Sequence, residues 1–192
     1  MDEIFLVSGL PRSGTSMMME ILQAGGIQLF TDNRRKADDH NPRGYFEFER
    51  VKKIPEGETA WLSEAVGKAV KVISPLLHYL PDEYHYKIIL MKRDINEILS
   101  SQDLMLKSKG QGSQIRDEKM KQIYNENTAL VLNYLDQNSN ISYLVCDYNE
   151  TLEDPLHAVE QIANFLDLSQ WIPEMVKIVD PDLYRHRLWQ QA

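Results

Sequence analysis

Residues 6–16 read LVSGLPRSGTS and join two segments with different hydrophobic periods. Before the junction, Ile4 to Val7 form a continuous apolar run that glycine and proline end, which predicts a short buried β-strand. After Thr15, apolar or small residues recur with the spacing of one helix face, at Met18, Ile21, Leu22 and Gly25. The pair Gly25-Gly26 predicts the end of this helix.

A glycine-containing turn before a helix gathers free backbone N–H groups and the positive end of the helix dipole. Such a turn binds anions, and phosphate above all. Gly9 and Gly14 have the spacing of the phosphate-binding P-loop, G-x-x-x-x-G-K-[ST]. Thr15 stands at the lysine position and Ser16 follows it, so the cation that usually contacts the β- and γ-phosphates is missing there. The cation of this loop is instead Arg12.

The segment Pro11–Ser16, PRSGTS, resembles the 5′-phosphosulfate loop of the sulfotransferase family, P-[KR]-S-G-[ST]-[ST]. The resemblance implies that the donor is 3′-phosphoadenosine 5′-phosphosulfate (PAPS), which leaves as 3′-phosphoadenosine 5′-phosphate (PAP). It also implies that the whole loop binds this cofactor, through Pro11, Arg12, Ser13, Gly14, Thr15 and Ser16, with the backbone N–H groups of Ser13 to Ser16 on the phosphosulfate. Taken without the family, two glycines at this spacing also fit an ordinary turn between a strand and a helix.

A second part of the sequence resembles the family's 3′-phosphate element, in which an arginine ends a strand and a serine lies eight residues further on. Arg93 and Ser101 have this spacing, and Asp94 is the predicted N-cap of the helix between them. The resemblance implies that both residues bind the 3′-phosphate of PAPS. An arginine at a strand end is otherwise more often an ion-pair partner at the surface. Residues 145–155 also resemble the family's V-x-Y-E-x-L-x-x-D-P stretch, with one residue inserted.

Predicted strands alternate with predicted helices along the chain, which favours a parallel sheet covered on both faces. The predicted strands are Ile4–Val7, Ile27–Phe30, Ala69–Ile73, Lys87–Met91 and Ile141–Cys146. We therefore expect an α/β fold of three layers, α/β/α, with a central parallel sheet of the P-loop NTPase-like sulfotransferase type. A single domain is expected to cover residues 1–192. Ligands of such folds bind at the carboxyl ends of the strands, so the loop 8–16 and Arg93 should share one rim.

Composition excludes several classes of protein. Hydrophobic residues make up 43% of the 192, enough for a core, and no apolar run approaches the ~20 residues of a membrane span. Cys146 is the single cysteine and lies in an apolar strand, so we expect a core residue, no internal disulfide and a cytoplasmic location. The net charge of −8, from 21 basic and 29 acidic residues, counts against nonspecific binding of nucleic acid.

Residues 31–45 are charged and rich in turn formers, and predict an ordered functional loop or a solvated flap. The segment Asn41–Glu47, NPRGYFE, is similar to the N-P-[KR]-G-[YW]-[FW]-E signature of many bacterial sulfotransferase-like proteins. Residues 107–114 are the most flexible-looking stretch and a candidate lid. Lys71 lies within a predicted strand, where it either extends to solvent at the strand edge or faces a site.

The resemblance implies that Arg12 neutralises the charge that grows on the leaving phosphate, as the family's loop lysine or arginine does. A hydroxyl acceptor also needs a base, for which Glu47 is the first candidate, and Glu49 and His78 are alternatives. The chain differs from the animal cytosolic enzymes in three ways. It is shorter, and it ends before any glycine-rich cofactor loop like theirs. Residues 71–75 read KVISP, where those enzymes carry K-T-H-L-P with a catalytic histidine. No metal is needed, and the five histidines are scattered.

The predicted function is transfer of a sulfuryl group from PAPS to a hydroxyl or amine of a small-molecule, glycan-like or lipid-like acceptor. One alternative is a P-loop kinase or NTPase, for which Asp147, after the last predicted strand, is the candidate Mg²⁺ ligand. Another is a nucleotide-binding protein without catalytic activity. The acceptor is not encoded in a readable pattern, because specificity is expected in the irregular segments 31–58 and 107–114.

Overall fold

A parallel sheet lies at the centre of the molecule, which we describe from a computed structural model that covers residues 2–38, 41–108, 110 and 117–180. Within these residues the sheet has the strands β1 (Glu3–Gly9), β2 (Ala69–Lys71), β3 (His85–Lys92) and β4 (Ile141–Asp147), in the order β2-β1-β3-β4. All three strand pairs are parallel, with Leu6 of β1 opposite both Val70 and Ile88. The predicted α/β fold with a central parallel sheet is confirmed.

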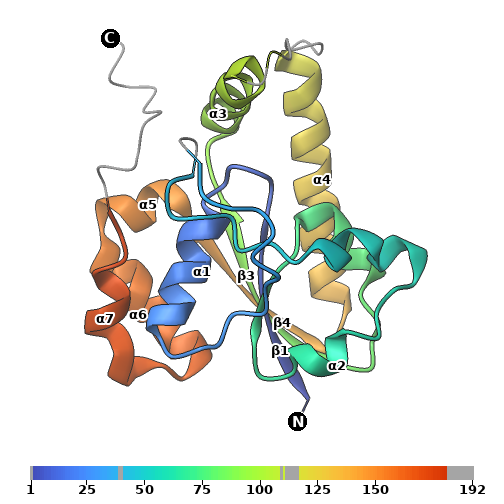
Figure 1. Cartoon of the computed structure of the whole chain (residues 1–192), viewed down its shortest axis with the longest axis vertical. Helices are drawn as coiled ribbons and strands as arrows, with labels where there is room; N and C mark the ends of the chain where they lie inside the picture. Colours follow the sequence, from blue (N-terminus) through green and yellow to red (C-terminus); the bar gives the residue numbers. More distant parts are fainter. Residues whose placement is uncertain (1, 39–40, 109, 111–116, 181–192) are drawn as a thin grey trace.

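Helices cover both faces of this sheet (Figure 1). On one face lie α1 (Thr15–Ala24), α5 (Tyr148–Glu153), α6 (Pro155–Leu166) and α7 (Ile172–Val176). On the other lie α2 (Leu62–Ala65), α4 (Asp117–Gln137) and the 3₁₀ helices η1 (Glu49–Glu56) and η2 (Ser74–Tyr79). The helix α3 (Ile95–Ser108) continues from β3 and contacts α4.

Successive side chains of a strand point to opposite faces of the sheet, and this alternation divides the core into two hydrophobic clusters. Val7 of β1 and Ile89 of β3 pack with α1, α6 and α7, whereas Leu6 and Ile88, one residue earlier, pack with the opposite layer. All four side chains are buried. Cys146 is buried in the first cluster, as expected, and its burial raises the pKa of the thiol to about 12.

The predicted strand at 27–30 is wrong, because a single bridge, between Leu29 and Ala69, is all the pairing that forms there. The chain then turns away from the sheet, and the ring of Phe30 packs against those of Phe48 and Trp61, at centroid distances of 4.8 and 5.9 Å. The proposed lid at 107–114 lies mostly outside the described residues. Across the described part of the chain, no helix has the length and apolar character needed to span a membrane.

Candidate functional site

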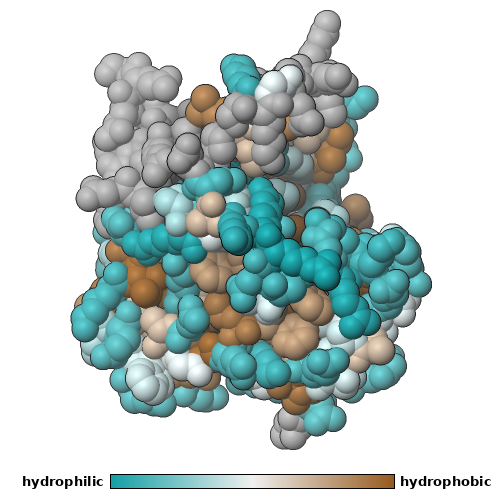
Figure 2. All heavy atoms as spheres, in the orientation of Figure 1, coloured by the Kyte–Doolittle hydropathy of each residue, from teal (hydrophilic) through white to brown (hydrophobic). Residues whose placement is uncertain are grey.

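A cavity of about 380 Å³ opens where the carboxyl ends of the strands meet. Its lining combines charged groups with apolar side chains from both ends of the chain and from the segments between the strands. The lining residues include Arg12, Ser16, Arg35, Asn41, Arg43, Tyr45, Glu47, Phe48, Val51, Lys71, Ile73, Leu76, Arg93, Ser101 and Met105. On the face shown in Figure 2, hydrophilic residues cross the middle and hydrophobic residues reach the surface below them. The cavity therefore offers contacts to both an anionic and an apolar group.

The helix that begins at this cavity lacks a side-chain cap. Gly14 is its N-cap, with a left-handed φ of 95°, and it has no side chain to accept from the N–H groups of the first turn, which contains no acidic residue. The helices after β3 and β4 differ, because Asp94 and Asp147 each accept hydrogen bonds from two backbone N–H groups of the next turn. The N–H groups at the start of α1 and the helix dipole therefore face the cavity without a capping carboxylate of the kind that Asp94 and Asp147 provide.

Close packing explains why the N-cap of α1 is glycine. A Cβ atom at Gly14 would clash with the ring of Tyr148. Ser13, by contrast, is turned inward: its N–H and its hydroxyl both donate to the carbonyl of Leu10, at 3.1 and 2.7 Å. The predicted contact from the N–H of Ser13 is thus already used within the turn, whereas Gly14, Thr15 and Ser16 line the cavity.

The structure brings the two predicted phosphate elements into direct contact. Nε of Arg12 donates to Oγ of Ser101 at 2.9 Å, and Nη1 of Arg93 donates to the carbonyl of Arg12 at 3.0 Å. Burial lowers the pKa of Arg12, with the charge of Arg93 adding to the effect. Arg93 and Ser101 are therefore in direct contact with the loop 11–16 through Arg12.

Glu97 holds Arg93 in this position. Nε of Arg93 lies 3.0 Å from Oε2 of Glu97, and the two side chains are only 7% and 2% exposed. The guanidinium also lies over the ring of Tyr148, 4.5 Å from its centroid. Glu97 was not among the predicted site residues, although its spacing of four from Arg93 fits an ion pair along one helix face.

Lys71, whose direction the sequence left open, faces the cavity. Its Nζ donates to Oγ of Ser16 at 3.1 Å and to the carbonyl of Tyr45 at 2.8 Å. Burial lowers the pKa of this ammonium to about 8, although the carboxylate of Glu47 acts in the opposite direction. A cation that contacts neutral oxygens beside an uncapped helix is well placed to bind an anion.

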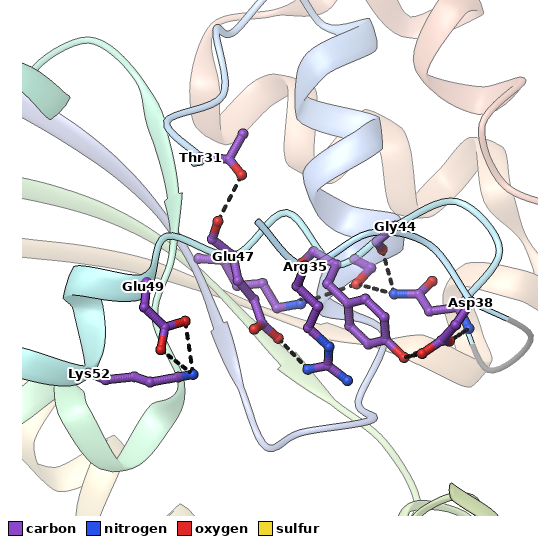
Figure 3. A network of polar contacts seen from close by, with 11 residues as sticks. Thr31, Arg35, Asp38, Gly44, Glu47, Glu49 and Lys52 are labelled. Carbon is purple, nitrogen blue, oxygen red and sulfur yellow. Dashed lines mark hydrogen bonds and ion pairs between the residues drawn. The ribbon is translucent and has the colours of Figure 1, made fainter. Parts of the chain in front are cut away.

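The segment 31–49 forms a polar network beside the cavity (Figure 3). Arg35 donates to Oε1 of Glu47 at 2.8 Å, and its guanidinium lies 3.3 Å from the ring centroid of Tyr45. Of the three candidate bases, Glu47 lines the cavity. Glu49 is exposed and pairs with Lys52 at 2.9 Å. His78 is also exposed, and its ring packs on Tyr79. Neither of them lines the cavity within the described residues.

Two residues of the NPRG segment contribute contacts that sequence reasoning missed. Nδ2 of Asn41 donates to Oγ of Ser16 at 2.9 Å. Arg43 reaches across the cavity wall to Glu20 of α1 at 3.4 Å, to the carbonyl of Ile178 at 2.7 Å and to Asp180 at 3.1 Å. The resemblance to the N-P-[KR]-G-[YW]-[FW]-E signature had indicated that this segment matters, but it did not predict a partner for either side chain.

Comparisons with known proteins agree with this fold. Two solved structures are similar, each at 14% identity and a TM-score of 0.50. One is the Sulfotransferase Domain from the Curacin Biosynthetic Pathway, where the match covers 87% of this chain and 74% of that chain. The other is mouse sulfotransferase SULT7A1 complexed with PAP, where it covers 99% of this chain and 68% of that chain. At that identity they show the fold alone. No curated protein sequence matches the chain. The family described as "Sulfotransferase domain" matches residues 2–181. The chain therefore belongs to the sulfotransferase domain family.

Proposed function

We propose that this chain transfers a sulfuryl group from PAPS to a hydroxyl or amine of an acceptor. The observation that carries the proposal is the uncapped N-terminus of α1, which meets Arg12 and Lys71 at one cavity. Family membership supports sulfuryl transfer, and a structural neighbour is titled as a complex with PAP. An anion with a second, separated phosphate suits this cavity because Arg93 and Ser101 also line it.

The donor's 5′ end would bind to the backbone N–H groups of Gly14 to Ser16 and to the hydroxyl of Ser16, with the ammonium of Lys71 beside them. Its 3′-phosphate would bind to Ser101 and Arg93. Because Arg12 contacts both of these residues, binding at one end of the donor is expected to order the other. PAPS supplies the sulfuryl group, whose bond to the 5′-phosphate oxygen breaks as the bond to the acceptor forms.

Arg12 is the residue we assign to charge stabilisation. Negative charge grows on the phosphate oxygen that leaves, and a guanidinium fixed over the loop stabilises that charge more than it stabilises the bound donor. Glu47 is the candidate base for a hydroxyl acceptor, because its carboxylate lines the cavity. The same carboxylate pairs with Arg35 at 2.8 Å, which holds it at the edge of the cavity.

The kinase or NTPase alternative has less support. Asp147, its candidate Mg²⁺ ligand, uses Oδ1 to cap α5, with the N–H of Asn149 at 2.8 Å, and does not line the cavity formed by the described residues. The noncatalytic alternative shares the binding residues and differs only in turnover. Both alternatives therefore have to be separated from sulfuryl transfer by an activity measurement.

The test is the reverse exchange, in which PAP and p-nitrophenyl sulfate give PAPS and p-nitrophenol. We expect release of p-nitrophenol that requires PAP and that is lost in the Arg12→Ala variant. Asn125→Ala, at an exposed position on α4, is the matched control and should keep this release. PAP binding without release from any of a panel of aryl sulfates would contradict the proposal and favour the noncatalytic protein. Mg²⁺-dependent hydrolysis of ATP would favour the kinase or NTPase.

A further inference from the structure

The hydroxyl of Ser16 receives two hydrogen bonds from groups that can only donate. One comes from the amide nitrogen of Asn41 at 2.9 Å and the other from the ammonium of Lys71 at 3.1 Å. A serine hydroxyl offers two acceptor lone pairs and one O–H donor. With both lone pairs occupied, only the hydrogen of Ser16 remains for a further partner.

A ligand in the cavity is the partner within reach of that hydrogen. Ser16 lies in the first turn of α1 and lines the cavity, and no hydrogen bond from its hydroxyl to any acceptor forms within the described residues. The neighbouring N–H groups of Gly14 and Thr15 are donors as well. The hydroxyl therefore joins a set of donors and would repel a ligand group that presents hydrogen, while favouring an anion.

The direction of the Asn41 amide is fixed by the turn in which it lies. Its nitrogen also donates to the carbonyl of Gly44, whose N–H in turn donates to the carbonyl of Asn41 at 3.1 Å. Gly44 has a left-handed φ of 103°, and Pro42 restricts the turn from the other side. The backbone N–H of Asn41 donates to Asp38 at 3.0 Å. Because the amide nitrogen faces two oxygens, rotation of the amide would place oxygen against oxygen.

We propose that Asn41 is a positioning residue that, together with Lys71, makes Ser16 an obligate hydrogen-bond donor to the ligand's anionic group. The identity of that ligand rests on the proposed function, whereas the direction of the hydroxyl rests on the contacts alone. Asn41 belongs to the segment that covers the cavity, so its bond to Ser16 also couples the position of this segment to the loop 11–16. This gives a physical reason for asparagine at the start of the NPRG segment.

A double-mutant cycle tests whether Asn41 acts through Ser16. The dissociation constants of PAP and of inorganic pyrophosphate are measured by calorimetry for the parent, Asn41→Ala, Ser16→Ala and the double variant, with Asn125→Ala as a control. We expect Ser16→Ala to weaken binding about tenfold or more, and Asn41→Ala to weaken it by a smaller factor. In the Ser16→Ala background, Asn41→Ala should change binding by less than about twofold. Equal factors in both backgrounds would overturn the proposal.

Asn41→Asp provides a second variant that keeps the size of the side chain but cannot donate to Ser16 or to the carbonyl of Gly44. Its carboxylate would accept the hydrogen of Ser16 and add a negative charge near the ligand, so binding of both probes should fall at least about tenfold below that of Asn41→Ala. Binding equal to or tighter than that of Asn41→Ala would overturn the proposal. If pyrophosphate shows the expected coupling while the parent does not bind PAP, the proposed function fails and the inference stands. If the parent binds neither probe, both fail.

Discussion

Lys71 shows how a single side chain can be poorly suited to the free protein and well suited to a complex. Its burial disfavours the charged form and lowers the pKa to about 8. Its described partners, Ser16 and the carbonyl of Tyr45, are neutral oxygens. A phosphate bound at the loop would add an opposite charge close to the ammonium and raise its pKa again, so binding of the anion and protonation of Lys71 should be linked.

The affinity for PAP should therefore fall as the pH rises through about 8, because the free protein loses the ammonium proton there. The phosphates of PAP are fully ionised from about pH 7.5 upward, so the change above that pH reports the protein. Calorimetry between about pH 7.5 and 9.5 should show a dissociation constant that rises by up to about tenfold per pH unit. Lys71→Met should bind more weakly and lose this dependence. A parent affinity that stays constant over the range would contradict the linkage.

Arg12→Ala should lower kcat by about a hundredfold or more, with a smaller loss of PAP affinity, because the guanidinium is assigned to charge that grows during transfer. Arg12 has a positive φ of 76°, a strain that alanine and lysine share with arginine, so substitutions compare side chains on one backbone. Arg12→Lys should recover a good part of the rate. The aryl sulfate exchange measures both values, and turnover within a few-fold of the parent in Arg12→Ala would contradict the assignment.

At the scale of elements, the helix starts were the most predictable part of the chain. Asp94 was predicted as an N-cap from local sequence, and it accepts hydrogen bonds from the first turn of its helix. The absence of a cap at Gly14 was predictable for the same reason. The role of Glu97 was not predictable in this way, because its bond to Arg93 depends on how the β3–α3 junction packs against Tyr148 and Asn149.

The ion pair of Arg93 and Glu97 should matter for the stability of that junction. Glu97→Ala would leave the guanidinium buried without its carboxylate, so the free energy of unfolding should fall by about 3 kcal/mol, the usual scale for breaking a buried pair. Urea denaturation measures the change. Glu118→Ala is the matched control, because Glu118 is 86% exposed in its pair with Lys121 and should alter stability by no more than ~0.5 kcal/mol. A loss for Glu97→Ala as small as the control's would show that the pair is not structural.

At the scale of the whole molecule, the sequence predicted the sheet and the rim on which the site lies, but not the position of the segment 31–48. Hydrophobic periods indicate strands and helices locally, and the parallel arrangement then follows from their alternation. The contacts of Asn41 with Ser16 and of Arg43 with Asp180 span 25 and 137 residues, and no local period encodes them. The same reason applies to the error at 27–30, because the rings that pack against Phe30, those of Phe48 and Trp61, lie far from it in the sequence.

Arg43 connects three parts of the chain, so its loss should loosen them together. Arg43→Ala removes bonds to Glu20, Ile178 and Asp180, and amide hydrogen exchange should accelerate at residues 41–48 and 176–180. Exchange in β1 and β3 should stay unchanged, because both strands are buried in the sheet. Arg34→Ala, at an exposed arginine of the same segment, is the control. Acceleration confined to residues 41–48 would show that Arg43 does not hold the 176–180 segment.

The central claim is that the cavity binds a nucleotide with both a 5′ and a 3′ anionic group, and it is tested most directly by comparing PAP with ATP in a thermal unfolding measurement. PAP at about 100 times its dissociation constant should stabilise the fold by roughly 2.7 kcal/mol. ATP lacks the 3′-phosphate, so at the same concentration it should stabilise the fold much less. Equal stabilisation by the two nucleotides, or none by PAP, would contradict the account.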